Sequence, residues 1–167
     1  MTVAPQAFDD AHGVKCDLAG EVLRSSGRLR LRVMGWSMLP TVWPGDTLVV
    51  DSVKSDAVSE GDIVLFGRDR RLFAHRVVKN NASGDTTILT RGDAMPAPDP
   101  PVDEAQLLGR VSFIMRNGKR IEPRRSLRFS ERAVAALVRG SDTAARVVVG
   151  IHGMRQTSQF QSSQNEI

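Results

Sequence analysis

A series of short apolar segments, separated by turns, fills the middle of the chain and constrains its fold more than any other feature. The segment RLRLRV at residues 28–33 alternates strictly between arginine and aliphatic residues. A period of two is typical of a β-strand with one buried face. We therefore expect Leu29, Leu31 and Val33 to face a core while the arginines between them face water.

Further apolar segments follow turns that contain glycine, proline or aspartate. Asn117-Gly118 is the pair preferred in a two-residue type I′ hairpin, and four prolines between residues 96 and 101 favour an extended loop. The fold class predicted is mainly β, a compact domain of short antiparallel strands. The other expected strands are residues 47–51, 63–66, 72–79, 86–90, 111–116 and 119–121.

We divide the chain into three parts. Residues 1–24 are expected to form a flexible leader, to about residue 15, and a short helix over 17–24. Residues 25–122 form the β domain. Residues 123–167 form a basic helical tail with a helix from Glu131 to about Arg139, capped by Ser130, and with disordered polar residues at the end.

Charge is distributed unevenly along the chain. The net charge is +4, but residues 110–146 contain ten basic and three acidic residues, a net charge of +7. Such a segment favours an acidic partner, and we expect peripheral contact with an anionic membrane through it, with no nucleic acid. The alternative is a solvated arginine-rich surface.

Other features bear on the compartment. No signal peptide and no apolar segment of membrane-spanning length, about 18 residues, is visible, so we expect a cytoplasmic protein that is at most peripheral at a membrane. The single Cys16 cannot form an intramolecular disulfide and is interpreted as a bystander. His12 and His152 are remote from other metal-ligating residues, so no metal or other cofactor is expected.

The segment GWSMLPTVWPGD at residues 35–46 directly follows the alternating strand. Gly35 before Ser37, and a proline three residues after it, predict a tight, exposed loop. A serine nucleophile needs an accessible hydroxyl and backbone N–H groups that point to the developing oxyanion. Trp36 and Met38 are candidates for lining a substrate cleft. Without further context, a serine that only stabilises a turn would be the better explanation of this segment.

Five segments, in order, make the chain similar to the signal peptidase I superfamily, over roughly residues 33–114. The nucleophile box Ser-Met-x-Pro-Thr matches residues 37–41 and is followed by Gly45-Asp46. The resemblance extends to Gly-Asp-Ile-Val-x-Phe at 61–66, His-Arg-Val at 75–77, Arg-Gly-Asp at 91–93 and Gly-Arg-Val at 109–111. The histidine in the third box resembles the endoplasmic-reticulum and archaeal type, whereas most bacterial members have lysine there.

The resemblance implies a serine endopeptidase that cleaves a protein or peptide substrate after small residues by acyl transfer. It implies that Ser37 is the nucleophile, His75 the general base and Asp93 the acid that orients the imidazole. These roles agree with the chemistry, because a neutral imidazole can take the serine proton and return it to the leaving amine. Asp99 and Asp103 compete with Asp93 for the third role. Asp46 and Asp62 follow glycines and are interpreted as turn caps.

Two alternatives remain open from the sequence. Self-cleaving regulators belong to the same superfamily, and the pair Ala19-Gly20 before Ser37 resembles their cleavage sites. Those proteins use lysine as the base and carry an N-terminal DNA-binding domain, for which the region before the β domain is too short. The other alternative is a non-catalytic β module that binds peptides.

Overall fold

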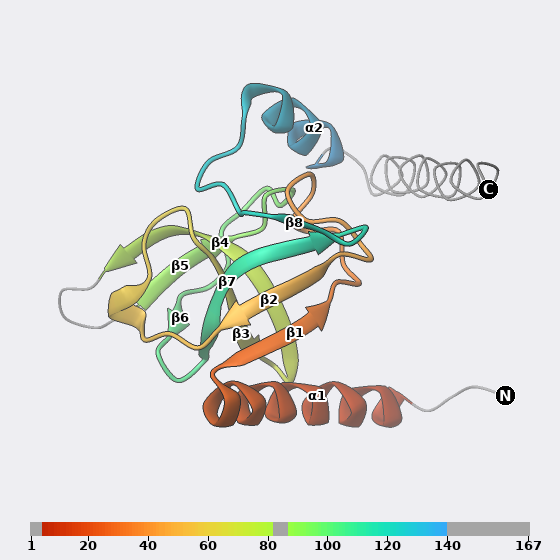
Figure 1. The fold of residues 1–167 in the computed structure, drawn as a ribbon, viewed down its shortest axis with the longest axis vertical. Helices are drawn as coiled ribbons and strands as arrows, with labels where there is room; N and C mark the ends of the chain where they lie inside the picture. The colour runs from red at the N-terminus through yellow and green to blue at the C-terminus, as the bar shows by residue number, and fades with distance from the viewer. Residues whose placement is uncertain (1–4, 82–86, 140–167) are drawn as a thin grey trace, which may run out of the picture.

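The computed structural model describes residues 5–81 and 87–139, which form a mainly β fold between two helices (Figure 1). The expectation of a mainly β fold is confirmed. The elements in chain order are α1 (Pro5–Ser26), β1 (Arg28–Arg32), β2 (Thr47–Asp51), the 3₁₀ helix η1 (Ser55–Ala57), β3 (Ile63–Arg68), β4 (Arg71–Asn81), β5 (Thr87–Arg91), β6 (Val102–Asp103), β7 (Leu107–Arg116), β8 (Lys119–Ile121) and α2 (Phe129–Arg139).

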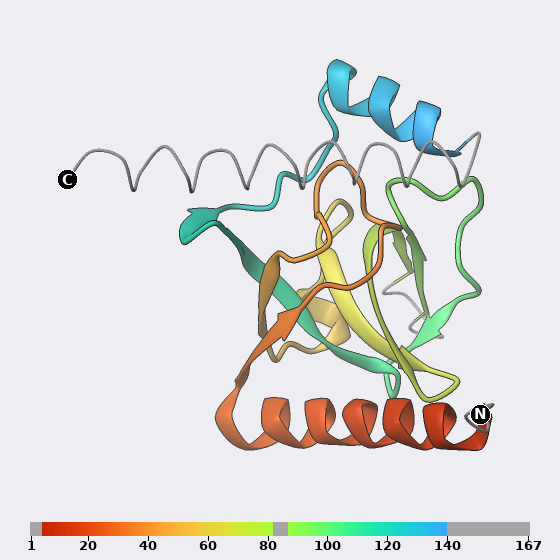
Figure 2. The ribbon, with the colours of Figure 1, turned by 90° about the vertical axis from the view of Figure 1, so that its right-hand side faces the viewer.

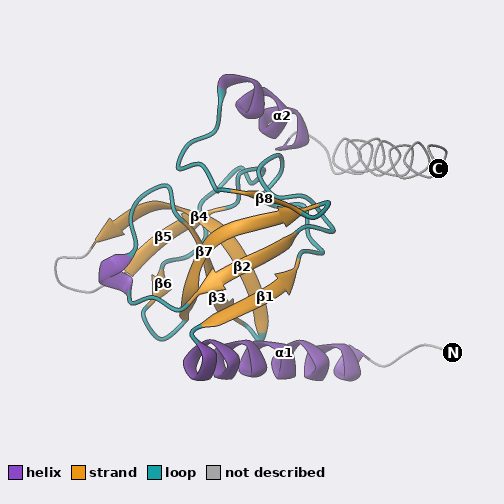
Figure 3. Ribbon diagram, in the orientation of Figure 1, coloured by secondary structure: helices purple, strands orange, loops and turns teal. Residues whose placement is uncertain are grey.

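The described strands form one strongly curved antiparallel sheet in the order β1-β2-β7-β3-β4-β5-β6, with β8 beside the end of β7 (Figure 3). The central strand β7 pairs with β2 over one half and with β3 over the other. Asn117-Gly118 forms the expected hairpin, because Arg116 pairs with Lys119 and both turn residues have positive φ. Strand β6 is an addition that the sequence did not indicate.

The two helices lie at opposite ends of the curved sheet, as the two perpendicular views show (Figures 1 and 2). Helix α1 packs against β1, β4 and β7 and ends where the Gly27 N–H bonds to the Leu23 carbonyl. It is longer than the expected helix over 17–24 and includes most of the expected leader. Helix α2 lies where a helix was expected. The final residues, expected to be disordered, lie outside the described part of the chain.

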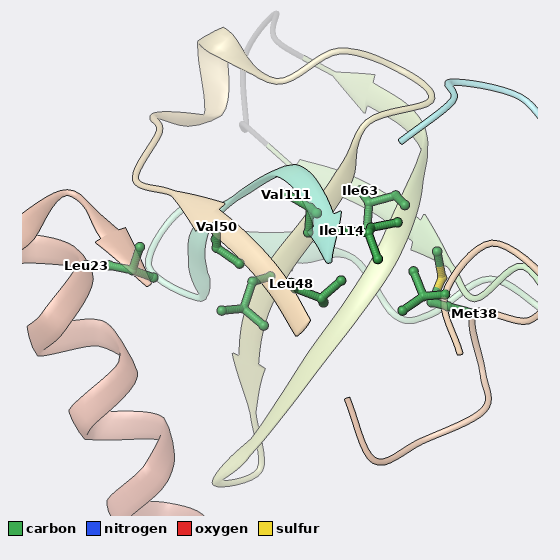
Figure 4. Packing of buried hydrophobic residues seen from close by; sticks show 9 residues of the cluster. Leu23, Met38, Leu48, Val50, Ile63, Val111 and Ile114 are labelled. Carbon is green, nitrogen blue, oxygen red and sulfur yellow. The ribbon is translucent and has the colours of Figure 1, made fainter. Parts of the chain in front are cut away.

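The main core lies between the two walls of the curved sheet (Figure 4). The inward-facing residues of β1, expected from its alternation, pack against this core, whereas the β1 arginines are exposed. A second cluster around Phe66, Val77 and Ile88 fills the other side of β3 and β4. The buried members of the main core are Leu23, Met38, Val42, Leu48, Val50, Ile63, Leu65, Val111 and Ile114.

No helix in the described part of the chain is long and apolar enough to cross a membrane.

We expect Ile114→Ala to destabilise the fold. The side chain is fully buried in the main core, and removal of a buried aliphatic side chain of this size costs about 2–5 kcal/mol. Urea denaturation followed by circular dichroism measures the change. Leu18→Ala is the matched control, because Leu18 is 57% exposed on α1 and its truncation should change stability by no more than about 0.5 kcal/mol. Equal destabilisation by the two variants would contradict the described core.

Candidate active site

The loop that carries Ser37 is closed at its base by backbone hydrogen bonds. The Val33 N–H donates to the Asp46 carbonyl and the Gly45 N–H donates to the Val33 carbonyl. The Asp46 carboxylate accepts a hydrogen bond from the Trp43 N–H, which confirms its expected role as a turn cap. These bonds make residues 33–46 a closed loop that lifts Ser37 away from the strand.

A small hydrophobic cluster supports this loop from behind. Leu39 and Ala94 are fully buried there, and Trp36, Trp43 and Val134 of α2 pack against them. Trp36, expected to line a substrate cleft, therefore packs in the support of the loop and is not among the residues that line the cavity described below. Met38, the other candidate, does line that cavity.

His75 lies in the middle of β4, opposite Val64 of β3, and is only 5% exposed. Its ring lies edge-on to Phe66, with 6.0 Å between the ring centroids, and tilted against Phe73 at 5.9 Å. These contacts fix the plane of the imidazole. Its Nε2 atom lies 2.9 Å from the Ser37 Oγ atom. The structure thus brings together two of the expected site residues, from β4 and from the loop after β1.

Asp99 occupies the other side of the ring. Its Oδ2 atom lies 2.7 Å from His75 Nδ1 and also accepts a hydrogen bond from the Thr90 hydroxyl at 2.7 Å. The Asp99 N–H donates to the Thr90 carbonyl, which holds the proline-containing loop against β5. A carboxylate can only accept a hydrogen bond, so the Nδ1 atom of His75 carries the proton and donates to Asp99. Nε2 is then unprotonated and can accept a hydrogen bond from the Ser37 hydroxyl.

The environment of Asp99 favours its ionised form. Burial raises the pKa of this carboxyl, but the hydrogen bonds from His75 and Thr90, with the charges of His75 and Arg68, outweigh burial and hold the pKa below its ordinary value. Asp99 therefore remains a carboxylate at neutral pH. It can orient the imidazole and stabilise the imidazolium that forms when His75 takes a proton.

Asp93, expected in the orienting role, has a different place in the structure. Its carboxylate makes a two-pronged ion pair with Arg76, with N–O distances of 2.8 Å, and accepts a hydrogen bond from the Thr41 hydroxyl. Both nitrogens of the His75 ring are meanwhile engaged by Ser37 and Asp99. The geometry corrects the expectation, since Asp99 takes the place at Nδ1 that was expected for Asp93.

The third candidate acid, Asp103, is exposed on β6, where it pairs with Thr87 of β5. Asp62 was expected to cap a turn, and this is confirmed because its carboxylate accepts the Ser59 N–H. Among the described residues, no group of three or more histidine, cysteine or acidic side chains could hold a metal ion. Cys16 lies on α1, where its Sγ atom faces Gly67 of β3.

Gly92 is a site residue that sequence reasoning missed. A Cβ atom at this position would lie 2.6 Å from the Ser37 carbonyl oxygen and 3.2 Å from His75 Nε2. Two residues further on, the Ala94 N–H donates to the same Ser37 carbonyl. The absence of a side chain at Gly92 therefore lets the loop after β5 approach Ser37 closely. The Arg-Gly-Asp sequence placed a glycine here, but its spacing could not show what the glycine approaches.

A cavity of about 750 Å³ opens beside Ser37 and His75. One side is formed by β1 and the segment after it, and the other by the first half of β4. In the described sheet β1 is an edge strand, and β4 pairs with β5 only from Arg76 onward. Two strand edges with free backbone groups therefore border the cavity, whose floor includes Leu48 and Leu65.

The sequence matches the model of the Peptidase S24-like family over residues 3–112. This span contains most of the sheet and all three members of the Ser37–His75–Asp99 hydrogen-bonded chain. The chain belongs to the Peptidase S24-like family. Membership supports the function of a peptidase or of a self-cleaving repressor. No curated protein matches the chain.

The two aspartates have different partners in the structure, since Asp99 contacts His75 and Asp93 contacts Arg76. Asp99→Asn should slow acylation of Ser37 by roughly 10²–10⁴-fold, because an amide favours the wrong imidazole tautomer, with little change in stability. Asp93→Asn should instead lower stability by about 3–5 kcal/mol, because it leaves the half-buried Arg76 without its charge partner.

The rate at which a fluorophosphonate phosphonylates Ser37 with loss of fluoride, followed by mass spectrometry, reports the activation of the hydroxyl on which acylation depends, and thermal unfolding measures stability. The two variants remove the same carboxylate charge, so each is the control for the other. Slow labelling of Asp93→Asn with normal labelling of Asp99→Asn would restore Asp93 to the orienting role.

Proposed function

We propose that this protein is a serine endopeptidase that resembles signal peptidase I of the histidine type. The observation that carries the proposal is the hydrogen-bonded chain from Ser37 Oγ through His75 to Asp99, with distances of 2.9 and 2.7 Å. A nucleophile, a base and an acid that orients the base are the three parts needed to activate a serine hydroxyl. Ser37 and His75 line a cavity of about 750 Å³, and Asp99 lies behind the His75 ring.

In the first half of the proposed reaction, Ser37 Oγ attacks the carbonyl carbon of the scissile bond while His75 Nε2 takes the hydroxyl proton. The charge of the imidazolium is balanced by the Asp99 carboxylate. The tetrahedral intermediate then collapses, the C–N bond breaks and His75 returns its proton to the leaving amine. The products of this half are the free amine and an ester between the substrate and Ser37.

In the second half, water attacks the ester carbonyl and gives its proton to His75 Nε2. Collapse of this intermediate releases the carboxylic acid and returns the proton to Ser37 Oγ. Backbone N–H groups of the Ser37 loop provide the oxyanion donors in this scheme, since Gly35 offers no hydroxyl. Hydrogen bonds that close the loop hold these donors in place, so little reorganisation is needed during reaction.

The two free strand edges support an extended peptide as the substrate. A peptide between β1 and the first half of β4 could add backbone hydrogen bonds to both edges, as in β-strand addition. Apolar side chains, among them Leu31, Met38 and Ala74, line the cavity on either side of such a peptide. The preference for small residues before the cleaved bond comes from the resemblance to signal peptidase I.

Self-cleavage at Ala19-Gly20 is disfavoured by the position of these residues. Both are buried within α1, and Gly20 lies against Leu108 of β7. A scissile bond must become extended to enter the site, so cleavage here would require unfolding of the helix and loss of its packing. The proposed substrate is therefore a separate peptide or protein.

The replacement Ser37→Ala tests this function. It should reduce peptide hydrolysis by roughly 10⁴-fold or more, as removal of a nucleophile does in serine peptidases, and leave the melting temperature nearly unchanged. A peptide library digested by the wild type and by the variant, with products identified by mass spectrometry, measures cleavage and the residues around it. Intact-mass analysis of the wild type reports self-cleavage in the same samples.

Three outcomes are distinct. Products that appear only with the wild type support the peptidase. Shortening of the wild-type chain with no peptide products would favour a self-cleaving regulator. If neither the wild type nor Ser37→Ala cleaves the library but both bind peptides, the protein is a non-catalytic peptide-binding module.

We also propose that the basic segment holds the protein at anionic membranes. The supporting observation is that three arginine side chains after β8 are exposed, those of Arg124 and Arg128 before α2 and that of Arg132 within α2. Each basic residue near an anionic surface contributes about 1 kcal/mol. Replacement of these three arginines by glutamine should weaken binding to phosphatidylserine vesicles by roughly 100-fold.

Vesicle sedimentation at low and at physiological salt measures this binding. A variant with Arg24, Arg30 and Lys54 replaced by glutamine is the matched control, because it loses the same charge from exposed residues elsewhere. Equal loss of binding in the two variants would show attraction by net charge alone, and no pelleting by the wild type at low salt would overturn the proposal.

A further inference from the structure

Three basic side chains line the cavity beside Ser37 and His75. They are Lys15 of α1, Arg32 at the end of β1 and Arg71 at the start of β4, and all three are exposed. No acidic residue is among the described residues that line the cavity. The cavity therefore combines the Ser37–His75 pair with apolar side chains and three positive charges, of which Arg71 lies four residues before His75 along β4.

Among the described residues, no carboxylate forms an ion pair with any of these three side chains. Other arginines of the sheet pair with acids, as Arg28 does with Asp51 and Arg116 with Asp46. Within the described residues, Lys15, Arg32 and Arg71 make no ion pair or side-chain hydrogen bond. In addition, Arg71 lies opposite Arg68 in the β3–β4 register. Asp69, in the exposed turn between them, does not line the cavity.

The packing of α1 fixes this arrangement. The helix contacts β4 and β1, the two strands that border the cavity. Figure 2 shows the hairpin between β3 and β4 reaching down to α1. The helix thus places Lys15 at the end of the cavity, where the two strand edges meet it. Lys15 keeps its place beside the cavity as long as α1 remains packed on the sheet.

We propose that the cavity selects an extended peptide that is apolar next to the cleaved bond and carries an acidic residue further along. Arg71 precedes His75 by four residues on an extended strand, a separation of roughly 13 Å. An extended peptide alongside β4 covers the same distance with the same number of residues. The acidic side chain therefore lies about four residues from the cleaved bond, on the one side of that bond that runs toward α1.

A peptide fits these observations better than a lipid surface does. The three cations line a cavity bordered by strand edges, whereas a membrane would need cations on a broad convex face. The inference deepens the proposed peptidase function and rests on it for the position of the cleaved bond.

The test uses peptide pairs that differ only by Glu and Gln, built on a sequence cleaved by the wild type in the library. The Glu/Gln position is moved along both sides of the cleaved bond. The wild type should prefer Glu by roughly three- to tenfold in kcat/KM at positions three to five residues away, on one side only. The preference should disappear at about 1 M salt, where the Debye length falls to about 3 Å.

Charge reversal identifies the residues responsible. The double variant Lys15→Glu/Arg71→Glu should reverse the preference, so that a Lys peptide is cleaved faster than the Glu peptide. Arg30→Glu is the matched control, because Arg30 is exposed on β1 but does not line the cavity, and it should keep the preference for Glu.

The failure of this inference can be told apart from the failure of the proposed function. Cleavage of the Glu and Gln peptides at equal rates would overturn the acidic preference and leave the peptidase intact. If no peptide is cleaved, fluorescence anisotropy with Ser37→Ala decides instead, using an acidic apolar peptide from the library and its Gln counterpart. Tighter binding of the acidic peptide, lost in the charge-reversed protein, would support the preference for an acidic peptide, whereas equal binding would overturn that preference. Binding to anionic vesicles that depends on Lys15 and Arg71 would also overturn it, in favour of a lipid.

Discussion

The guanidinium of Arg76 ties together segments that are far apart in the sequence, and the arrangement of the site depends on it. It makes five hydrogen bonds, to the Asp93 carboxylate, the Thr41 hydroxyl and the carbonyls of Gly61 and Arg124. A planar group with several donors in fixed directions is suited to this task, and lysine could not replace it. Through these bonds one side chain joins the Ser37 loop, the loop after β5 and the chain that leads to α2.

Two adjacent residues of β4, His75 and Arg76, point to opposite faces of the sheet and contact different partners. Successive side chains of a strand point to opposite faces, so His75 turns to Ser37 while Arg76 turns to Asp93 on the other face. A shift of the β4 register by one residue would exchange these two faces. The first half of β4 pairs with β3 along its whole length. This pairing therefore fixes the positions of both His75 and Arg76.

The sequence predicted the parts of this structure that depend on local patterns. The alternation in β1, the Asn117-Gly118 turn and the order of the boxes led to the fold class and to Ser37 and His75. The sequence could not choose between Asp93 and Asp99, because both follow β5 and only the path of the loop decides. That path depends on the hydrogen bond from the Asp99 N–H to the Thr90 carbonyl. The proline-rich sequence around Asp99 predicts an extended loop and gives no sign of this hydrogen bond.

The length of α1 was missed for a related reason. The residues before Asp17 include Gly13, which has low helix propensity and so favours a flexible leader. In the structure, the missing side chain of Gly13 is what allows the guanidinium of Arg70 to lie against the helix. Tertiary packing thus outweighs the low helix propensity of Gly13. The contact between Gly13 and Arg70 cannot be predicted from the local sequence pattern.

The two open strand edges beside the cavity have a consequence for the protein at high concentration. Unpaired edges are the places where copies of a β protein join sheet to sheet. Here the edges of β1 and β4 carry the unpaired Arg32 and Arg71. A second copy that approached with its own edge would bring the same positive charges into contact. The charges at the cavity therefore also discourage self-association and leave the cleft open to a chain of opposite charge.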